Sequence, residues 1–155
     1  MTINSVAIIG LGLLGGSIGL AAREYAPEIT TIGYDTDPDV RDAARKRGLA
    51  GTICDSAQDA VKSADLVIFC VPVGAIAQAA ADCADALPKD AIISDVGSSK
   101  QSVVDGLQAA LPHHHVIPAH PVAGTEQSGP QAGFPTLFQG RWCILTPPPA
   151  ADQAK

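Results

Sequence analysis

The glycines of the segment G-L-G-L-L-G, residues 10–15, have a spacing that suits the binding of phosphate groups. The segment directly follows the apolar run Val6–Ile9, and Asp35 lies twenty residues after its last glycine. Glycines at the start of a helix let backbone N–H groups approach a diphosphate, and the helix N-terminus adds partial positive charge. A carboxylate at this distance accepts hydrogen bonds from ribose hydroxyls. The spacing therefore predicts a dinucleotide-binding site, where glycines alone would indicate only a turn.

Each position of the segment has its own expected task. Gly10 permits the tight turn, Gly12 lets the backbone approach the pyrophosphate, and Gly15 allows close contact between helix and strand. Leu13 and Leu14 begin the helix, so their N–H groups are expected to face the cofactor phosphates.

Asp35 favours NAD over NADP, because a carboxylate repels a 2′-phosphate and no arginine follows it directly. Arg41 is the residue that would weaken this expectation if its side chain reached back to the site. The alternative for Asp35 is a solvated residue at the end of a strand.

Apolar runs alternate with helical segments along the chain. The expected strands are 6–9, 29–34, 66–71, 91–94, 116–117 and 142–145, and the expected helices are 14–25, 38–47, a short one capped by Ser56, 73–87 and 100–111. Such alternation is typical of βαβ units. We expect an α/β fold, a Rossmann-type doubly wound and mainly parallel sheet in a single domain. Ligands bind such sheets beyond the carboxyl ends of the strands, so Val71 and Pro72 are expected to contact the ribose on the nicotinamide side, although an ordinary strand-to-helix turn would look the same.

Composition limits the classes of function. Of 155 residues, 46% are hydrophobic and 17% charged, which allows a sizeable core and excludes a disordered chain. A net charge of −6 argues against a nucleic-acid partner. No apolar run is long enough to span a membrane, and the N-terminus lacks the charged region of a signal peptide, so we expect a cytoplasmic protein. The four cysteines include no C-x-x-C pair, and His113–His115 are consecutive, so no metal site is expected.

Three further segments are more specific than the glycines. They are D-V-G-S-S-K at 95–100, H-P-V-A-G-T-E-Q-S-G at 120–129, and L-F-Q-G-R-W-C-I-L-T-P at 137–147. Together with residues 10–17, their order and spacing resemble the N-terminal half of the prephenate/arogenate (cyclohexadienyl) dehydrogenase family. The resemblance covers essentially the whole chain.

The resemblance implies NAD-dependent oxidative decarboxylation of prephenate or arogenate in tyrosine biosynthesis. His120 matches the family's catalytic histidine, which accepts the hydroxyl proton as hydride leaves; imidazole has a suitable pKa for this at neutral pH. Ser98 matches the serine that hydrogen-bonds the same hydroxyl and orients the histidine. Glu126 matches an acidic residue at the mouth of the active site, with a part in gating and ion pairing.

The same residues also have structural interpretations. Without the resemblance, His120 would more often be a loop residue held by a backbone hydrogen bond. Ser98 could cap the helix that begins near Lys100, and Glu126 could be a solvated loop carboxylate. Lys100 itself could neutralise a cofactor phosphate or simply occupy the first helical turn.

Residues 1–146 are predicted to form the NAD-binding domain and residues 147–155 a linker or tail. The resemblance implies a helical second domain that dimerises and supplies basic groups for the substrate, and this chain is expected to lack it. A homodimer is therefore expected only with that domain, and the chain alone is expected to bind the cofactor with little or no turnover. Two alternatives remain: another NAD(P)-linked reductase of similar architecture, and a non-catalytic NAD-binding module. The choice between prephenate and arogenate stays open.

Overall fold

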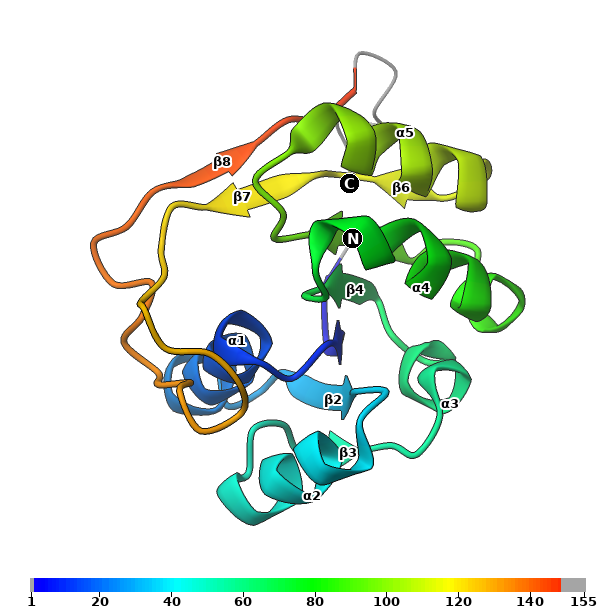
Figure 1. The fold of residues 1–155 in the computed structure, drawn as a ribbon. Helices are drawn as coiled ribbons and strands as arrows, with labels where there is room; N and C mark the ends of the chain where they lie inside the picture. The colour runs from blue at the N-terminus through cyan, green and yellow to red at the C-terminus, as the bar shows by residue number, and fades with distance from the viewer. Residues whose placement is uncertain (1, 149–155) are drawn as a thin grey trace.

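A parallel sheet forms the centre of the molecule in the computed structural model, which describes residues 2–148. Its strands are β1 (Ser5–Ile9), β2 (Thr30–Tyr34), β3 (Thr52–Ile53), β4 (Leu66–Phe69), β5 (Ile92–Asp95) and β6 (His115–Val116). They lie in the order β3-β2-β1-β4-β5-β6, and every neighbouring pair is parallel (Figure 1). This is the strand order of the Rossmann fold, so the predicted fold class is confirmed.

Helices cover both faces of the sheet (Figure 1). They are α1 (Leu13–Tyr25), α2 (Pro38–Arg47), α3 (Ala57–Val61), α4 (Ile76–Cys83) and α5 (Lys100–Ala110). Neighbouring residues of β1 point to opposite faces: Ile8 packs in a core with Leu20 of α1 and Ala44 of α2, whereas Ile9 packs with residues of α3, α4 and α5. A strand buried on both sides has to be apolar throughout, which explains the continuous apolar run that β1 shows in the sequence.

The helix signals that the sequence carries act as expected. The Asp37 carboxylate accepts a hydrogen bond from the Asp39 N–H (2.8 Å) at the start of α2, and Gly48 ends that helix in the left-handed conformation (φ 63°). At α3, the Ser56 hydroxyl accepts from the Asp59 N–H (3.1 Å).

Several element boundaries differ from the prediction. The strand expected over 66–71 ends at Phe69, and the helix expected over 73–87 is divided into a 3₁₀ turn η1 (Val73–Ala75), α4 and a second 3₁₀ turn η2 (Ala84–Ala86). The strand expected over 142–145 is β8 (Cys143–Leu145). It does not join the main sheet but pairs antiparallel with β7 (Ala119–Pro121) in a separate ribbon. Both β3 and β7 were missed, because they are too short to show periodicity and neither contains two adjacent apolar residues such as Val116 and Ile117.

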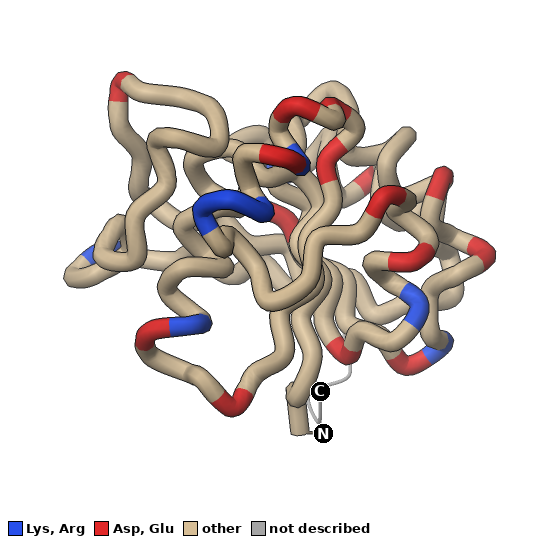
Figure 2. The backbone as a smooth tube through the Cα atoms, turned by 90° about the horizontal axis from the view of Figure 1, so that it is seen from below, with Lys and Arg blue, Asp and Glu red and all other residues tan. Residues whose placement is uncertain are grey.

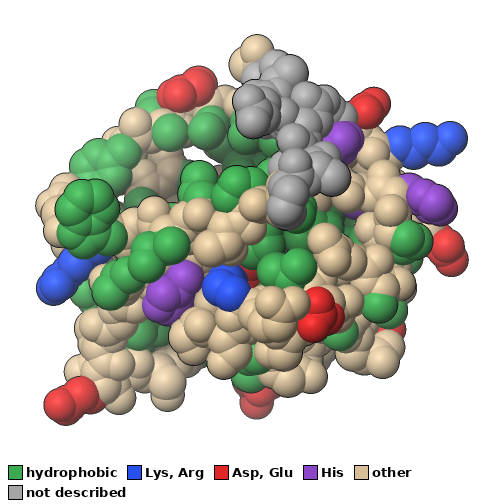
Figure 3. All heavy atoms as spheres, turned by 90° about the horizontal axis from the view of Figure 1, so that it is seen from above, with side chains coloured by type: hydrophobic (Ala, Val, Ile, Leu, Met, Phe, Trp, Pro, Cys, Tyr) green, Lys and Arg blue, Asp and Glu red, His purple; other side chains and the backbone are tan. Residues whose placement is uncertain are grey.

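The surface differs from one face to another. On the face with β7 and β8, hydrophobic side chains gather around a hollow (Figure 3), and Trp142 (81% exposed), Ile144 and Leu145 are among the exposed apolar residues. Acidic and basic positions are interspersed along the backbone (Figure 2).

Within residues 2–148, no helix has both the length and the apolar character needed to cross a bilayer. Pro147 and Pro148 belong to no helix or strand, and the rest of the predicted linker, 149–155, lies outside the described residues.

Candidate functional site

A cleft opens at the carboxyl edge of the sheet, between the loops that follow its central strands. Its lining comes from the turn after β1, the end of β2, and the segments after β4 and β5. The lining residues are Gly10, Gly12, Leu13, Leu14, Asp35, Thr36, Cys70, Val71, Pro72, Val73, Val96, Gly97, Ser128 and Gly129. The strand order reverses between β1 and β4, which is where doubly wound sheets bind their ligands.

A second, smaller hollow continues the cleft toward α3 and α4. It shares Gly10, Asp35, Thr36 and Val71 with the first, and adds apolar and polar residues that could surround a base: Ile9, Tyr34, Ala57, Gln58, Ala79 and Asp82. Asp35 therefore lies where the two hollows meet, which is the position expected for a residue that contacts the adenosine ribose.

The glycines of the turn have different surroundings. Gly10 has φ +100°, and a Cβ there would lie 2.8 Å from the Cys70 carbonyl carbon, so the turn packs directly on the end of β4. A Cβ on Gly15 would lie 1.9 Å from the Gly10 carbonyl oxygen. A Cβ on Gly12 would meet no described atom within 4 Å, so this glycine faces the open cleft. As the N-cap of α1, Gly12 has no side chain to accept from the first-turn N–H groups, and these stay available to a phosphate.

Both carboxylate oxygens of Asp35 are positioned by backbone N–H groups. Oδ2 accepts from Leu11 in the glycine turn (2.9 Å), and Oδ1 accepts from Asp37 (3.0 Å). The carboxylate is thus held against the turn, and Asp35 lines both hollows of the cleft. Together with the open side of Gly12, this arrangement fits a dinucleotide: N–H donors for the diphosphate and a fixed acceptor for a ribose.

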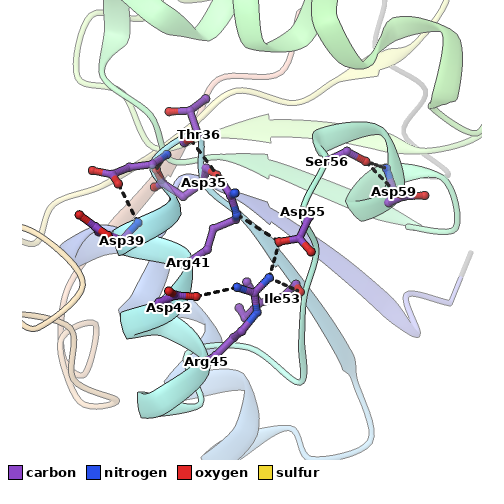
Figure 4. Close-up of polar contacts among 11 residues, drawn as sticks. Asp35, Thr36, Asp39, Arg41, Asp42, Arg45, Ile53, Asp55, Ser56 and Asp59 are labelled. Atoms are coloured by element: carbon purple, nitrogen blue, oxygen red, sulfur yellow. Dashed lines mark hydrogen bonds and ion pairs between the residues drawn. The ribbon is translucent and has the colours of Figure 1, made fainter.

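Arg41 does reach back to the turn after β2 (Figure 4). Its Nη1 donates to the carbonyl oxygens of Asp35 (2.8 Å) and Thr36 (3.1 Å), and its Nε lies 3.4 Å from Asp55 Oδ1. The guanidinium therefore binds backbone beside the site and forms an ion pair with Asp55. The neighbouring Arg45 holds Asp55 as well, and this interaction lowers the pKa of the Asp55 carboxyl.

The predicted catalytic residues lie around the cleft rather than in its lining. His120 is half-buried on β7, with Nδ1 3.5 Å from the Val96 carbonyl oxygen, and Val96 lines the cleft. Ser98 is exposed and precedes Ser99, the residue that occupies the N-cap of α5, so Ser98 is not the cap. Glu126 is exposed in a separate hollow with Thr125, Gln127, Ala132 and Phe134.

Lys100 is the first residue of α5, so it does occupy the first helical turn, and its ammonium also has a structural role. Its ammonium donates to the carboxylate of fully buried Asp95 (2.5 Å) and to the Ala119 carbonyl oxygen (2.6 Å). The same carboxylate also accepts from the N–H groups of Gly97 (2.7 Å) and Ala119 (3.2 Å). This buried group joins the end of β5, the start of α5 and the start of β7, and so fixes the strand that carries His120.

Sequence reasoning missed several residues of the cleft. Val96 and Gly97 follow β5 directly, so their position after a strand was a usable signal. Ser128 and Gly129 come from a loop more than a hundred residues away from Gly12, and no local pattern places them. Among residues 2–148 there is no group of three or more His, Cys, Asp or Glu side chains arranged to hold a metal ion.

Comparison with known proteins identifies the family. A profile described as "Prephenate dehydrogenase, nucleotide-binding domain" matches residues 18–155. This chain belongs to that family. It is 52% identical over 142 residues to a cyclohexadienyl dehydrogenase of Zymomonas mobilis and 36% identical over 152 residues to a prephenate dehydrogenase of Bacillus subtilis. It covers 92% and 97% of its own length in these matches but 48% and 41% of the relatives, so it spans about half of their length or less.

Comparison with solved structures supports the same family. The fold matches the prephenate dehydrogenase of Aquifex aeolicus, crystallised with hydroxyphenyl propionate and NAD⁺, with a TM-score of 0.89 and 30% identity over 99% of this chain and 54% of that one. A Synechocystis arogenate dehydrogenase matches with a TM-score of 0.88 at 24% identity, which shows the shared fold. The predicted family and its nucleotide-binding half are therefore confirmed.

Proposed function

We propose that this chain is the NAD-binding part of an enzyme that oxidatively decarboxylates prephenate or arogenate in tyrosine biosynthesis. The observation that carries the proposal is the pairing of an open glycine turn with Asp35, whose carboxylate is held by the Leu11 N–H at 2.9 Å. Family membership and the names of the relatives support the reaction class.

The glycine turn and Asp35 bind and orient the cofactor. First-turn N–H groups of α1, from Leu13 and Leu14, donate to the diphosphate, and Asp35 accepts from the adenosine ribose. Val71 and Pro72, which line the same cleft, are proposed to position the nicotinamide side. When bound, NAD supplies the acceptor for the hydride that leaves the substrate carbinol carbon.

His120 is proposed to accept the hydroxyl proton. The carbonyl oxygen of Val96 near Nδ1 favours the tautomer with its proton on Nδ1, which leaves a lone pair on Nε2. Ser98 is proposed to hydrogen-bond the same hydroxyl, and Glu126 to act at the mouth of the site. We further propose a cytoplasmic location, and a homodimer that depends on the remainder of the enzyme.

Titration of the chain with NAD and NADP by calorimetry tests the cofactor assignment. NAD is expected to bind more tightly, and Asp35→Ala is expected to weaken NAD binding about tenfold or more, because a hydrogen bond to a charged group is lost. Asp39→Ala, which also removes a carboxylate but at an exposed position of α2, is the control. Tighter binding of NADP than NAD would contradict the assignment and direct attention to Arg41.

Addition of prephenate or arogenate, with and without a separately produced second half of the enzyme, tests the reaction. NADH is expected only in the complemented mixture, and His120→Asn is expected to abolish it. Cofactor binding with no turnover in either mixture would favour a non-catalytic NAD-binding module instead.

A further inference from the structure

One loop of the molecule, residues 124–134, lies against the glycine turn although more than a hundred residues separate them in sequence. Its Ser128 and Gly129 line the same hollow as Gly12, Leu13 and Leu14. The cofactor cleft therefore has a wall that the Rossmann βαβ units do not supply.

Several contacts hold this loop in place. At its C-terminal end, the Phe134 N–H donates to the Ser17 hydroxyl of α1 (3.1 Å). Gly133 packs on the same helix so closely that a Cβ would lie 3.1 Å from the Ser17 nitrogen and 3.2 Å from the Gly16 carbonyl carbon. Ser17 is fully buried by this arrangement.

Arg47, the last residue of α2, provides the other attachment. One guanidinium nitrogen, Nη1, donates to the Pro130 carbonyl oxygen, and the other, Nη2, donates to the Gly133 carbonyl oxygen (2.9 Å). The planar fork of arginine can bind two carbonyl oxygens three residues apart, whereas a lysine would supply a single point of charge. The two acceptors follow Gly129, whose φ of +82° turns the loop at the edge of the cleft.

We propose that Arg47 is a positioning residue for the cofactor: by holding Pro130 and Gly133, it keeps Ser128 and Gly129 in place as the second wall of the diphosphate part of the cleft. This inference rests on the proposed dinucleotide site. It assigns a role in cofactor affinity to a residue of α2 that does not line the cleft.

Calorimetric titration with NAD tests the role of Arg47. Arg47→Gln is expected to weaken NAD binding about tenfold or more, because two hydrogen bonds from a charged group are lost, and Arg47→Lys is expected to weaken it less. Lys46→Gln makes the same change of charge on the neighbouring exposed residue and is expected to leave NAD affinity unchanged. Equal affinity in Arg47→Gln and the unmodified chain would overturn the inference, whereas no NAD binding by the unmodified chain would overturn the proposed function itself.

A second pair of variants does not depend on the stability of Arg47→Gln. Ser128 and Gln127 are neighbouring exposed residues, but Ser128 lines the cofactor cleft and Gln127 lines the separate hollow beside Glu126. Ser128→Trp is expected to weaken NAD binding at least tenfold by filling the cleft, while Gln127→Trp is expected to leave it within about twofold. Similar effects of both substitutions would contradict the second wall.

Amide NMR separates positioning from general stability. Addition of NAD to the unmodified chain is expected to shift the amide signals of both Gly12 and Gly129. In Arg47→Gln, at NAD concentrations that saturate the site, the Gly12 signal is still expected to shift while the Gly129 response is lost. A full Gly129 response in that variant would show that Arg47 does not position the wall.

Discussion

Gly12 and Gly15 lie in the same turn, but the space available for a Cβ atom differs between them. A Cβ on Gly15 would overlap the Gly10 carbonyl oxygen at 1.9 Å, whereas a Cβ on Gly12 would extend into the open cleft. We therefore expect Gly15 to be needed for folding and Gly12 for binding of a ligand.

Substitution by alanine separates these two requirements. Gly15→Ala is expected to lower the free energy of unfolding by at least about 2 kcal/mol, because backbone must move to admit the methyl group. Gly12→Ala is expected to keep the unfolding midpoint within a few degrees while weakening NAD binding at least tenfold. Thermal unfolding and calorimetry check this, with Gly74→Ala, another glycine with open space around it, as the control for both. Normal NAD binding by Gly12→Ala would show that the diphosphate does not approach this turn.

At the scale of elements, buried and half-buried carboxylates connect segments of the fold: Asp95 links elements that no sheet ladder joins, and Asp65 reinforces the start of the parallel pair β1–β4. Asp95 joins β5, α5 and β7 through Lys100 and Ala119. Asp65, just before β4, accepts hydrogen bonds from the N–H groups of Asn4 (2.8 Å) and Ser5 (3.0 Å) at the start of β1.

Removing one partner of the Asp95–Lys100 pair is expected to cost more than removing both. Lys100→Met leaves a buried carboxylate without its cation, and we expect a loss of about 3 kcal/mol in the free energy of unfolding. The double variant Asp95→Asn/Lys100→Met is expected to recover part of that loss. Urea unfolding of the single and double variants measures this coupling, and strictly additive effects would contradict it.

Asp65 gives the protein a defined pH dependence. Hydrogen bonds from Asn4 and Ser5 lower the pKa of the Asp65 carboxyl below its unfolded value of roughly 4. A lowered folded pKa means that the stabilisation is present above the unfolded pKa and is lost as pH falls through the folded pKa. Asp65→Asn is therefore expected to lower the unfolding midpoint at pH 7, with the difference from the unmodified chain shrinking below about pH 4. A difference that stays constant from pH 7 to pH 3 would contradict this origin.

At the scale of the whole molecule, the cofactor cleft brings together parts of the chain that are far apart in the sequence. Its walls come from the segments that follow β1, β2, β4 and β5, from the start of α1 and from the 124–134 loop, so a bound ligand is expected to stabilise all of them against unfolding. Linkage predicts a gain of about 2.7 kcal/mol in the free energy of unfolding at an NAD concentration one hundred times the Kd.

Thermal unfolding at increasing NAD concentration measures this gain. The unmodified chain is expected to show one transition whose midpoint rises with NAD, and Gly12→Ala is expected to show a much smaller rise at the same concentrations. A midpoint that does not respond to saturating NAD would mean that the cleft is not the binding site.

The sequence by itself determined the fold class, the family and about half of the residues that line the cleft. These depend on local patterns: apolar runs long enough to be strands buried on both faces, helix caps at Asp37 and Ser56, and glycines placed between a strand and a helix. The acidic residue at the end of β2 follows from spacing alone, since the βα unit before it has a nearly constant length.

Only the tertiary structure decided which distant groups meet. The pairing of β7 with β8, the burial of Asp95 with Lys100, and the attachment of the 124–134 loop by Arg47 and Ser17 all join residues far apart in the chain. No periodicity in the sequence records such contacts, because they arise from the way that packed elements bring side chains and carbonyl groups within hydrogen-bonding distance. Periodic burial is a local property of the chain, and the partner of a buried charge is a property of the fold.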